Sequence, residues 1–244
     1  MSGKCVLVTG AARRVGAAVA RALHTAGANV VIHFRSSSEA ATELARELNE
    51  ARPASAALAE CDLLDLEQLP GLAKAALDAF GSLDMLVNNA STFYPTPVGD
   101  ITEIDWNDLV GTNLKAPLFL SQAATPALRK AGGLILNIAD IHGMRPLGRH
   151  PVYSVAKAGL IMLTKALARE LGPQVRVNAI APGPVMWPED GMDSQLKEVI
   201  IDKTALKRPG SVEDVARAVL FFATQAPYVT GQILAVDGGR SVGW

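Results

Sequence analysis

The chain has 244 residues, of which 49% are apolar, and a formal net charge of −1 from 23 basic and 24 acidic side chains. This composition supports a sizeable folded core, and the near-neutral charge gives no reason to expect a nucleic-acid or anionic-membrane partner. The sequence shows neither a signal-peptide pattern nor an apolar run of about 18 residues, so we expect no membrane span and a cytoplasmic location.

Short apolar runs alternate with amphipathic helical stretches along the whole chain. The runs that we interpret as strands are 5–8, 30–34, 56–59, 85–87, 134–138, 175–180 and 233–236. This alternation predicts an α/β fold, a Rossmann-type doubly wound parallel sheet of about seven strands with helices on both faces. No linker divides the chain, so residues 1–244 are expected to form a single domain. Cys5 and Cys61 lie in or beside strands and are expected to be buried, reduced thiols.

The first strand runs into a turn that contains Gly10 and Gly16, within "VLVTGAARRVGAAVA". Glycine permits a tight turn there, and the N-terminus of the following helix offers N–H groups to phosphate. Two glycines alone are weak evidence, but ligands bind beyond the carboxyl ends of parallel strands. We therefore predict that Gly10, Arg13, Arg14, Val15 and Gly16 hold a nucleotide phosphate.

The end of the second strand, "VIHFRSSSE", indicates which nucleotide binds. An NAD site usually has an acid there for the ribose hydroxyls, whereas this chain has His33, Arg35 and Ser36. A guanidinium and a hydroxyl suit a 2′-phosphate. The sequence therefore predicts NADPH as the cofactor; the alternative is a solvated Arg35 beside a helix-capping serine.

The fifth strand ends at a carboxylate, Asp140, which lies thirteen residues before Tyr153. It is either a loop cap or part of a proton-transfer site. Tyr153 and Lys157 are four residues apart in a strong helical pattern, so they share one face of the helix. The ammonium is expected to lower the tyrosine pKa and make the phenol a usable general acid. Such a pair is frequent by chance and needs further support.

A long irregular segment, 184–210, follows the sixth strand. Prolines and glycines crowd its start, and a short helical pattern follows. We interpret it as a substrate-binding lid, with an idle surface insertion as the alternative. His142 and His150 flank the site without further ligand-spaced partners, so no metal site is expected.

The whole chain resembles the short-chain dehydrogenase/reductase family. The matching pieces are "TGAARRVG", Asp62 in "CDL", "LVNNA" at 86–90, Asn113, "NIAD", "YSVAK", "APGPV" and "TGQILAVDGG". The resemblance implies that Tyr153 is the acid, that Lys157 holds the nicotinamide ribose, and that Asn113 fixes a proton-relay water. It also implies a homotetramer. The remaining cofactor contacts that it implies are Asp62 and Leu63 at the adenine, Asn89 and Ala90 along the cleft, and Pro182 and Gly183 at the nicotinamide.

Three departures from that family resemble its pteridine reductase subgroup. Asp140 replaces the usual serine, Arg14 replaces the middle glycine of the phosphate loop, and Ser91 follows "NNA" in "NNASTFYPTP". An ionised aspartate cannot donate to a ketone oxygen, but it can orient the tyrosine hydroxyl beside a ring nitrogen. The resemblance therefore implies that Asp140 and Tyr153 act together on a C=N bond.

A flat pterin suits the residues near this site. Phe93 could stack on one face of it, with packing in the core or lid as the alternative. Ser91 could bind the amino-pyrimidinone edge, and Arg14 could bridge phosphate and pterin or face phosphate alone. Tyr94 is expected to pack against the prolines that follow it, and Trp187 is a candidate for lid closure.

The sequence thus predicts NADPH-dependent reduction of a dihydropterin to a tetrahydropterin, and of fully oxidised pterins to dihydropterins as an extension. The partner is a small pteridine substrate rather than a nucleic acid or a membrane. A short-chain carbonyl or 3-oxoacyl reductase is the first alternative, and a non-catalytic NADP(H)-sensing protein is the second.

Overall fold

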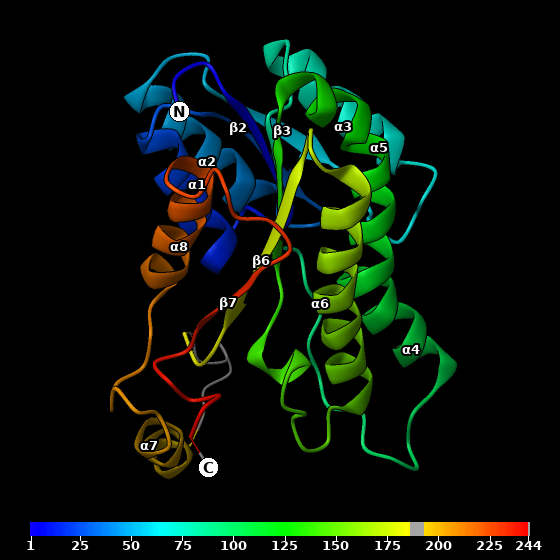
Figure 1. The fold of residues 1–244 in the computed structure, drawn as a ribbon, viewed down its shortest axis with the longest axis vertical. Helices are drawn as coiled ribbons and strands as arrows, with labels where there is room; N and C mark the ends of the chain where they lie inside the picture. The colour runs from blue at the N-terminus through cyan, green and yellow to red at the C-terminus, as the bar shows by residue number, and fades with distance from the viewer. Residues whose placement is uncertain (186–192, 244) are drawn as a thin grey trace.

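The computed structural model describes residues 1–185 and 193–243 (Figure 1). Within them one sheet contains seven strands, and every neighbouring pair runs parallel. The strands are β1 (Cys5–Val8), β2 (Asn29–Phe34), β3 (Ala56–Glu60), β4 (Met85–Asn88), β5 (Leu134–Ile138), β6 (Arg176–Pro182) and β7 (Ile233–Val236). Their order is β3-β2-β1-β4-β5-β6-β7, so the chain reverses its direction of winding between β1 and β4. The predicted doubly wound Rossmann-type fold is confirmed.

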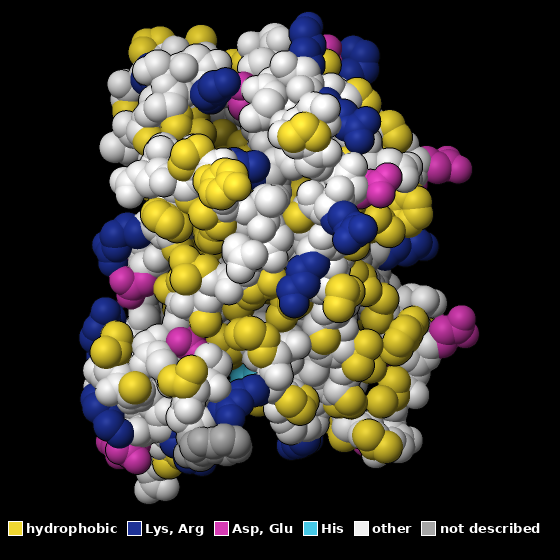
Figure 2. Space-filling view, in the orientation of Figure 1, with side chains coloured by type: hydrophobic (Ala, Val, Ile, Leu, Met, Phe, Trp, Pro, Cys, Tyr) yellow, Lys and Arg dark blue, Asp and Glu magenta, His cyan; other side chains and the backbone are white. Residues whose placement is uncertain are grey.

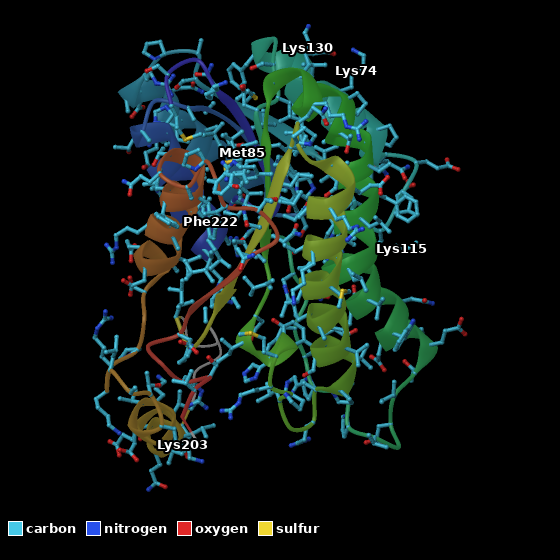
Figure 3. The ribbon with its side chains drawn as sticks, viewed as in Figure 1. Lys74, Met85, Lys115, Lys130, Lys203 and Phe222 are labelled. Atoms are coloured by element: carbon cyan, nitrogen blue, oxygen red, sulfur yellow. The ribbon has the colours of Figure 1, made fainter. Side chains whose placement is uncertain are left out.

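Helices cover both faces of this sheet. They are α1 (Arg14–Thr25), α2 (Ser38–Ala51), α3 (Leu69–Phe80), α4 (Glu103–Val110), η1 (Gly111–Lys115), α5 (Ala116–Ala131), η2 (Ile141–Gly143), α6 (Pro151–Leu171), α7 (Ser194–Asp202) and α8 (Val212–Thr224). Figure 1 shows α1, α2 and α8 on one face and α3, α5 and α6 on the other. Each face has its own core; Met85 of β4 and Phe222 of α8 belong to the α1–α8 side (Figure 3).

The strands form where the sequence is apolar on both sides of the chain, as a sheet covered on both faces requires. All four residues of β1 and all five of β5 are buried. Cys5 and Cys61 are buried as predicted, and burial raises the pKa of their thiols to about 12 and about 11.

Two helix starts follow their capping boxes. At α4 the Thr102 hydroxyl accepts from the Asp105 N–H at 3.2 Å, while the Asp105 carboxylate accepts from the Thr102 N–H at 2.9 Å. Ser211 and Asp214 form the same reciprocal pair at α8. Each box satisfies two N–H groups that would otherwise lack partners at a helix start.

The structure differs from the sequence-based expectation at two elements that position the site. β6 begins one residue later and extends two residues further than predicted, to Pro182, because β5 and β7 flank it. The segment η1, which contains Asn113, is π-helical. Single π-helical turns occur frequently at functional sites. No helix in the described part of the chain is long and apolar enough to cross a membrane.

Candidate active site

The predicted site residues meet at the carboxyl ends of β1, β4, β5 and β6, in the lower half of Figure 1. This edge lies where the winding reverses, which is where open parallel sheets bind ligands. β5 leads through Asp140 into η2, and the start of α6 brings Tyr153 back to the same edge.

Asp140 divides its carboxylate between two partners. Its Oδ2 accepts a hydrogen bond from the Tyr153 hydroxyl at 2.8 Å, and its Oδ1 accepts from the His142 N–H at 2.7 Å. Asp140 therefore caps η2 and also contacts the tyrosine, and its part in proton transfer stays a prediction.

Tyr153 is 4% exposed, and its pKa lies well above the ordinary value near 10. Burial raises that pKa first, and the charge and hydrogen bond of Asp140 raise it further, while the neighbouring Ser91 hydroxyl lowers it. The expected lowering of the tyrosine pKa is therefore wrong for this arrangement. The phenol keeps its proton at neutral pH and is a donor rather than a phenolate.

Lys157 is 2% exposed, and its Nζ donates to the carbonyl oxygen of Ile138 at 3.0 Å. The same Nζ lies 5.7 Å from the centre of the Tyr153 ring, so the helical spacing brings the two side chains together as predicted. Burial lowers the lysine pKa to about 8, against the opposing charge of Asp140. This lysine is the largest fully buried side chain among the described residues, so it is a component of the site's core rather than a surface cation.

Asn113 is fully buried and holds the segment that follows β4. Its amide nitrogen donates to the Thr92 and Leu109 carbonyl oxygens, each at 2.9 Å, and its Oδ1 accepts from the Ser91 hydroxyl at 2.6 Å. The side chain thus fixes the loop that carries two of the predicted substrate residues, Ser91 and Phe93. A proton-relay water at Asn113 stays a prediction.

Phe93 is 53% exposed and lies at the mouth of the site. Its ring stacks on His150 with centroids 4.7 Å apart and planes 8° apart, and it meets Tyr153 edge-on at 4.8 Å. The sequence reasoning had assigned His150 only to a loop without a metal role. A histidine ring therefore occupies one face of Phe93, and a flat ligand can stack on that face only by displacing it.

The glycine turn after β1 is held by close backbone packing. Gly10 has φ +60, a conformation that glycine adopts without strain. A Cβ on Gly16 would lie 2.2 Å from the Gly10 carbonyl oxygen and 2.7 Å from Asn89 Nδ2. Asn89 Nδ2 donates to the Thr9 and Gly10 carbonyl oxygens, and the Thr9 hydroxyl accepts from the Asn89 and Ala90 N–H groups. Sequence reasoning missed Thr9, which joins the two loops.

The start of α1 is where the sequence predicts that a nucleotide phosphate binds. Arg13 precedes the helix without a side-chain cap, and no acidic residue lies in the first turn. Arg14 has φ +55, the left-handed region that favours glycine. This explains physically why a glycine is usual at that position, and an arginine held there at a cost of about 1–2 kcal/mol is typical of a functional site.

His33 is buried, and both of its ring nitrogens contact backbone groups. Nδ1 accepts from the Gly10 N–H at 3.0 Å, so Nε2 carries the hydrogen that is donated to the Cys61 carbonyl oxygen at 3.1 Å. Burial lowers the ring's pKa to about 4, which keeps it neutral. His33 therefore holds the glycine turn through the Gly10 N–H, and neither of its ring nitrogens is available to a phosphate. The prediction that His33 binds the cofactor phosphate is wrong for this geometry.

The other predicted cofactor residues lie around the same edge. Arg35 and Ser36 are exposed just beyond β2, and the helix cap itself is Ser37, whose side chain makes no capping hydrogen bond. Asp62 accepts from the Leu64 N–H at 3.0 Å, and Leu63 is buried. The expected contacts of these residues with a nucleotide stay predictions.

Pro182 and Gly183 end β6 beside the C-terminal segment. A Cβ on Gly183 would lie 2.6 Å from the Asp237 Cβ, so only glycine fits there without a shift. Of the expected lid, residues 184, 185 and 193–210 are described, and they include α7. Trp187 lies outside the described residues. Within the described residues no group of three potential ligands could hold a metal ion.

Comparisons with known proteins agree with this fold. A family model described as enoyl-(acyl carrier protein) reductase matches residues 10–241. A 3-oxoacyl-[acyl-carrier-protein] reductase, FabG, of Staphylococcus aureus strain Mu50 is 35% identical over 240 residues, 97% of each chain. Pteridine reductase 1 of Leishmania tarentolae is 35% identical over 277 residues, covering 97% of this chain and 96% of that protein.

A solved structure shows the same likeness in three dimensions. A crystal structure from Sinorhizobium meliloti 1021 that carries the description short-chain alcohol dehydrogenase superimposes with a TM-score of 0.95 at 32% identity. The superposition covers 100% of this chain and 98% of that one. The matched family and the relatives together show an oxidoreductase of the kind that uses NAD(P)H. The chain belongs to the short-chain dehydrogenase/reductase family.

Proposed function

We propose that this protein reduces the C=N bond of a dihydropterin with NADPH and forms a tetrahydropterin. The observation that carries the proposal is the hydrogen bond of 2.8 Å between the Tyr153 hydroxyl and Asp140. A ketone reductase needs a second donor for the carbonyl oxygen, whereas a carboxylate that already accepts from two donors only accepts. A ring nitrogen needs one proton and gains from a nearby negative charge, which this pair supplies.

The chain's own groups have separate tasks in this reaction. NADPH supplies the hydride to the ring carbon when it is bound. Tyr153, whose raised pKa keeps it protonated, delivers the proton to the nitrogen, and Asp140 holds the tyrosine hydroxyl in place. Lys157 is anchored on Ile138 beneath the tyrosine ring, where it would meet the nicotinamide ribose.

The residues beyond β1 and β2 support NADPH as the cofactor. A side chain at Gly16 would collide with the Gly10 carbonyl oxygen and force the turn open. Arg35 and Ser36 supply a cation and a hydroxyl where an acid would repel a 2′-phosphate. Replacing Arg35 by aspartate is expected to raise the KM for NADPH at least ten-fold and to raise the KM for NADH far less. Equal KM values for NADPH before and after the change would contradict the proposal that Arg35 binds the 2′-phosphate.

The substrate would lie between the cofactor and the loop held by Asn113. Ser91 would bind the polar edge of the pterin, and Arg14 would bridge that edge and the cofactor phosphates. The centroids of the Phe93 and His150 rings are now 4.7 Å apart. Phe93 would stack on the pterin ring after His150 moves away from its face. A His150→Ala variant is therefore expected to lower the KM for the pterin.

A second candidate function is reduction of 3-oxoacyl thioesters. The curated relatives favour it, since several are 3-oxoacyl-[acyl-carrier-protein] reductases at 34–35% identity, alongside one pteridine reductase at 35%. The identities do not separate the two functions, and the aspartate at position 140 supports the pteridine. For that reason we place the pteridine first.

One assay separates these functions. NADPH oxidation is measured with dihydrobiopterin, dihydromonapterin, dihydrofolate, biopterin and acetoacetyl-CoA at matched concentrations. We expect kcat/KM for the dihydropterins to exceed that for acetoacetyl-CoA by at least 100-fold. The reverse order would establish the oxoacyl reductase, and NADPH binding without turnover of any of them would establish a non-catalytic NADP(H)-sensing protein.

We further propose a homotetramer. Exposed apolar side chains gather over α4, α5 and α6 on the right of Figure 2, and they include Ile104, Trp106, Phe119 and Met162. Exposed apolar patches of this kind mark contacts between subunits. Sedimentation equilibrium is expected to give four times the mass of 25.6 kDa; the monomer mass would contradict the proposal.

A further inference from the structure

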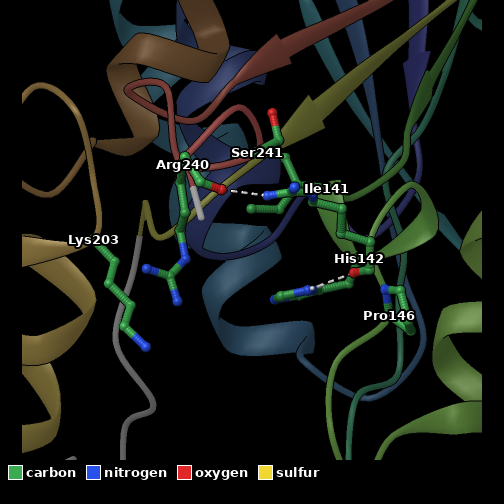
Figure 4. Close-up of a pocket in the computed structure, with 8 residues that line it drawn as sticks. Ile141, His142, Pro146, Lys203, Arg240 and Ser241 are labelled. Atoms are coloured by element: carbon green, nitrogen blue, oxygen red, sulfur yellow. Dashed lines mark hydrogen bonds between the residues drawn. The ribbon is translucent and has the colours of Figure 1, made fainter.

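A cavity of about 190 Å³ lies beside the reacting groups, on the far side of η2 from β5. Three segments that are distant in the sequence form its walls: η2 with the loop after it, the end of α7, and the C-terminal segment. The lining residues are Ile141, His142, Arg145, Pro146, Lys203, Arg240, Ser241 and Gly243 (Figure 4). No part of the nucleotide or pterin site described above uses this cavity.

The charged side chains among the described residues that line the cavity are all cations. Arg145, Lys203 and Arg240 line it, and among the described lining residues none is acidic. In Figure 4 the side chains of Lys203 and Arg240 extend in parallel into the same space, and the His142 ring faces them. The space-filling view shows basic side chains beside a histidine, in the hollow next to the part of the molecule that contains α7 (Figure 2). Cations gathered in a concave site attract an anion.

The walls are held together by backbone contacts, so the cations are positioned. Arg240 Nη1 donates to the Ile200 carbonyl oxygen at 2.9 Å and thereby joins the C-terminal segment to α7. Arg145 donates to the Gly243 carbonyl oxygen, and the Leu206 N–H donates to Gly238 at 3.0 Å. The bond to Ile200 uses one of the five N–H donors of Arg240.

The cavity adjoins the turn that begins at Asp140. The His142 N–H donates to Asp140, and the side chains of Ile141 and His142, the two residues that follow Asp140, line the cavity. The side chain of a ring substrate bound at Asp140 and Tyr153 would have to pass this turn to enter the cavity. The cavity is smaller than the roughly 300–1,000 Å³ that whole ligands occupy, so it suits the end of a substituent rather than a second molecule.

We propose that this cavity binds an anionic group, a phosphate or a carboxylate, at the end of the side chain of the ring substrate. The inference rests on the proposed function, because it takes the ring at Asp140 and Tyr153 to be the pterin. It deepens that function by naming a class of substrate: dihydropterins whose side chain ends in a negative charge.

The test compares substrates that differ only in that charge. KM and kcat are measured with NADPH for dihydroneopterin and for its terminal phosphate monoester, with dihydrofolate as the carboxylate arm. The wild-type protein is expected to have about ten-fold lower KM for the monoester than for the free alcohol, as charge-assisted hydrogen bonds provide. A preference for dihydrofolate over the monoester would assign the site to carboxylate instead of phosphate.

Variants then locate the effect. Lys203→Gln and Arg240→Gln are each expected to raise the ratio of KM for the monoester to KM for the alcohol about ten-fold, while kcat for the two substrates changes in parallel. Lys197→Gln is the matched control, because it removes a lysine of α7 that does not line the cavity. Lys203→Gln leaves the Arg240 bond to Ile200 intact, so it tests the charge without loosening the wall.

Two outcomes overturn the inference. One is an equal KM for the monoester and the alcohol in the wild-type protein, and the other is a shift with Lys197→Gln as large as that with Lys203→Gln. If neither dihydropterin is turned over, the proposed function fails while the cavity is tested separately. Calorimetry with inorganic pyrophosphate on protein saturated with NADP⁺ then shows binding that Lys203→Gln weakens, or shows none and refutes the anion site.

Discussion

The Asp140 side chain caps η2 and also accepts a hydrogen bond from the Tyr153 hydroxyl. Replacing it by serine tests the second of these roles. Asp140→Ser removes the charge that raises the Tyr153 pKa, so that pKa falls and the acid loses its proton at lower pH. We expect kcat for a dihydropterin to fall about 100-fold. The alkaline limb of the pH–rate profile should also move to lower pH.

Asp65→Ser is the control for that change. Asp65 also accepts from an N–H two residues further on, that of Glu67 at 3.1 Å, but it lies on the surface beside no tyrosine. It should leave kcat and the alkaline limb in place. An unchanged alkaline limb in Asp140→Ser would show that the carboxylate does not act on the phenol.

Arg14 provides a second prediction at this scale. Arg14→Gly relieves the left-handed backbone strain at φ +55 but adds conformational freedom to the unfolded chain, so we expect a net gain in stability of about 0.5 kcal/mol. The KM for NADPH should rise, because the guanidinium is lost. Urea unfolding and steady-state kinetics measure the two effects.

Arg13→Gly serves as its comparison, because Arg13 has an extended backbone with φ −141 and no strain to relieve. That variant should lose stability. If Arg14→Gly also loses stability, the positive φ at position 14 does not cost the folded protein the free energy that we expect.

The sequence predicted which residues lie together at the site better than it predicted their pKa values. The spacing of Tyr153 and Lys157 put them on one helix face, which is a local property and was predictable. The direction in which the tyrosine pKa shifts was not predictable. It depends on burial and on Asp140, which follows β5, whereas Tyr153 lies on α6. The cavity cations at 145, 203 and 240 resemble ordinary surface charges until the fold brings them together.

At the scale of elements, the turn between β1 and α1 depends on Gly16. Gly16→Ala would place a methyl group 2.2 Å from the Gly10 carbonyl oxygen, so we expect a loss of about 2 kcal/mol in the free energy of unfolding and weaker NADPH binding. Thermal unfolding with and without NADPH measures both effects.

Gly71→Ala is the matched control in α3. Nothing lies within 4 Å of the added methyl group, and alanine is the better helix former, so we expect a gain of about 0.5–1 kcal/mol. Equal effects of the two substitutions would mean that the close packing around Gly16 carries no energy.

The strands and most helices were predictable because their causes are local. A strand buried on both faces must be a continuous apolar run, and β1 and β5 have the predicted bounds. The capping boxes at α4 and α8 are equally local. The π-helical turn η1 was missed, because its hydrogen bonds depend on how Asn113 packs against the loop after β4 rather than on its own residue types.

At the scale of the whole molecule, His33 makes stability depend on pH. Its folded-state pKa is about 4 and its ordinary value is 6.5, so between these values the unfolded chain binds a proton that the folded chain does not. Stability should therefore fall as pH drops from 6.5 to 4, by up to about 3 kcal/mol from this residue. Urea unfolding at pH 7.5, 5.5 and 4.5 measures the fall.

A His33→Gln variant should be less stable at pH 7.5, because the Gly10 N–H loses its present acceptor. Its stability should also change less between pH 7.5 and 4.5 than that of the wild-type protein. The same slope in both proteins would show that the loss at low pH comes from other groups.

The divided carboxylate of Asp140 makes the turn η2 a shared component of two sites. In the two proposed sites, an anion at the side chains around His142 would act on the turn that fixes Oδ1, and a ring at Tyr153 would act on the bond at Oδ2. The two ends of one substrate would then influence each other's affinity through a single side chain, and thermodynamic reciprocity requires that influence to be equal in both directions. A ring fragment and a free anion should then change each other's affinity by the same factor even when no covalent bond joins them.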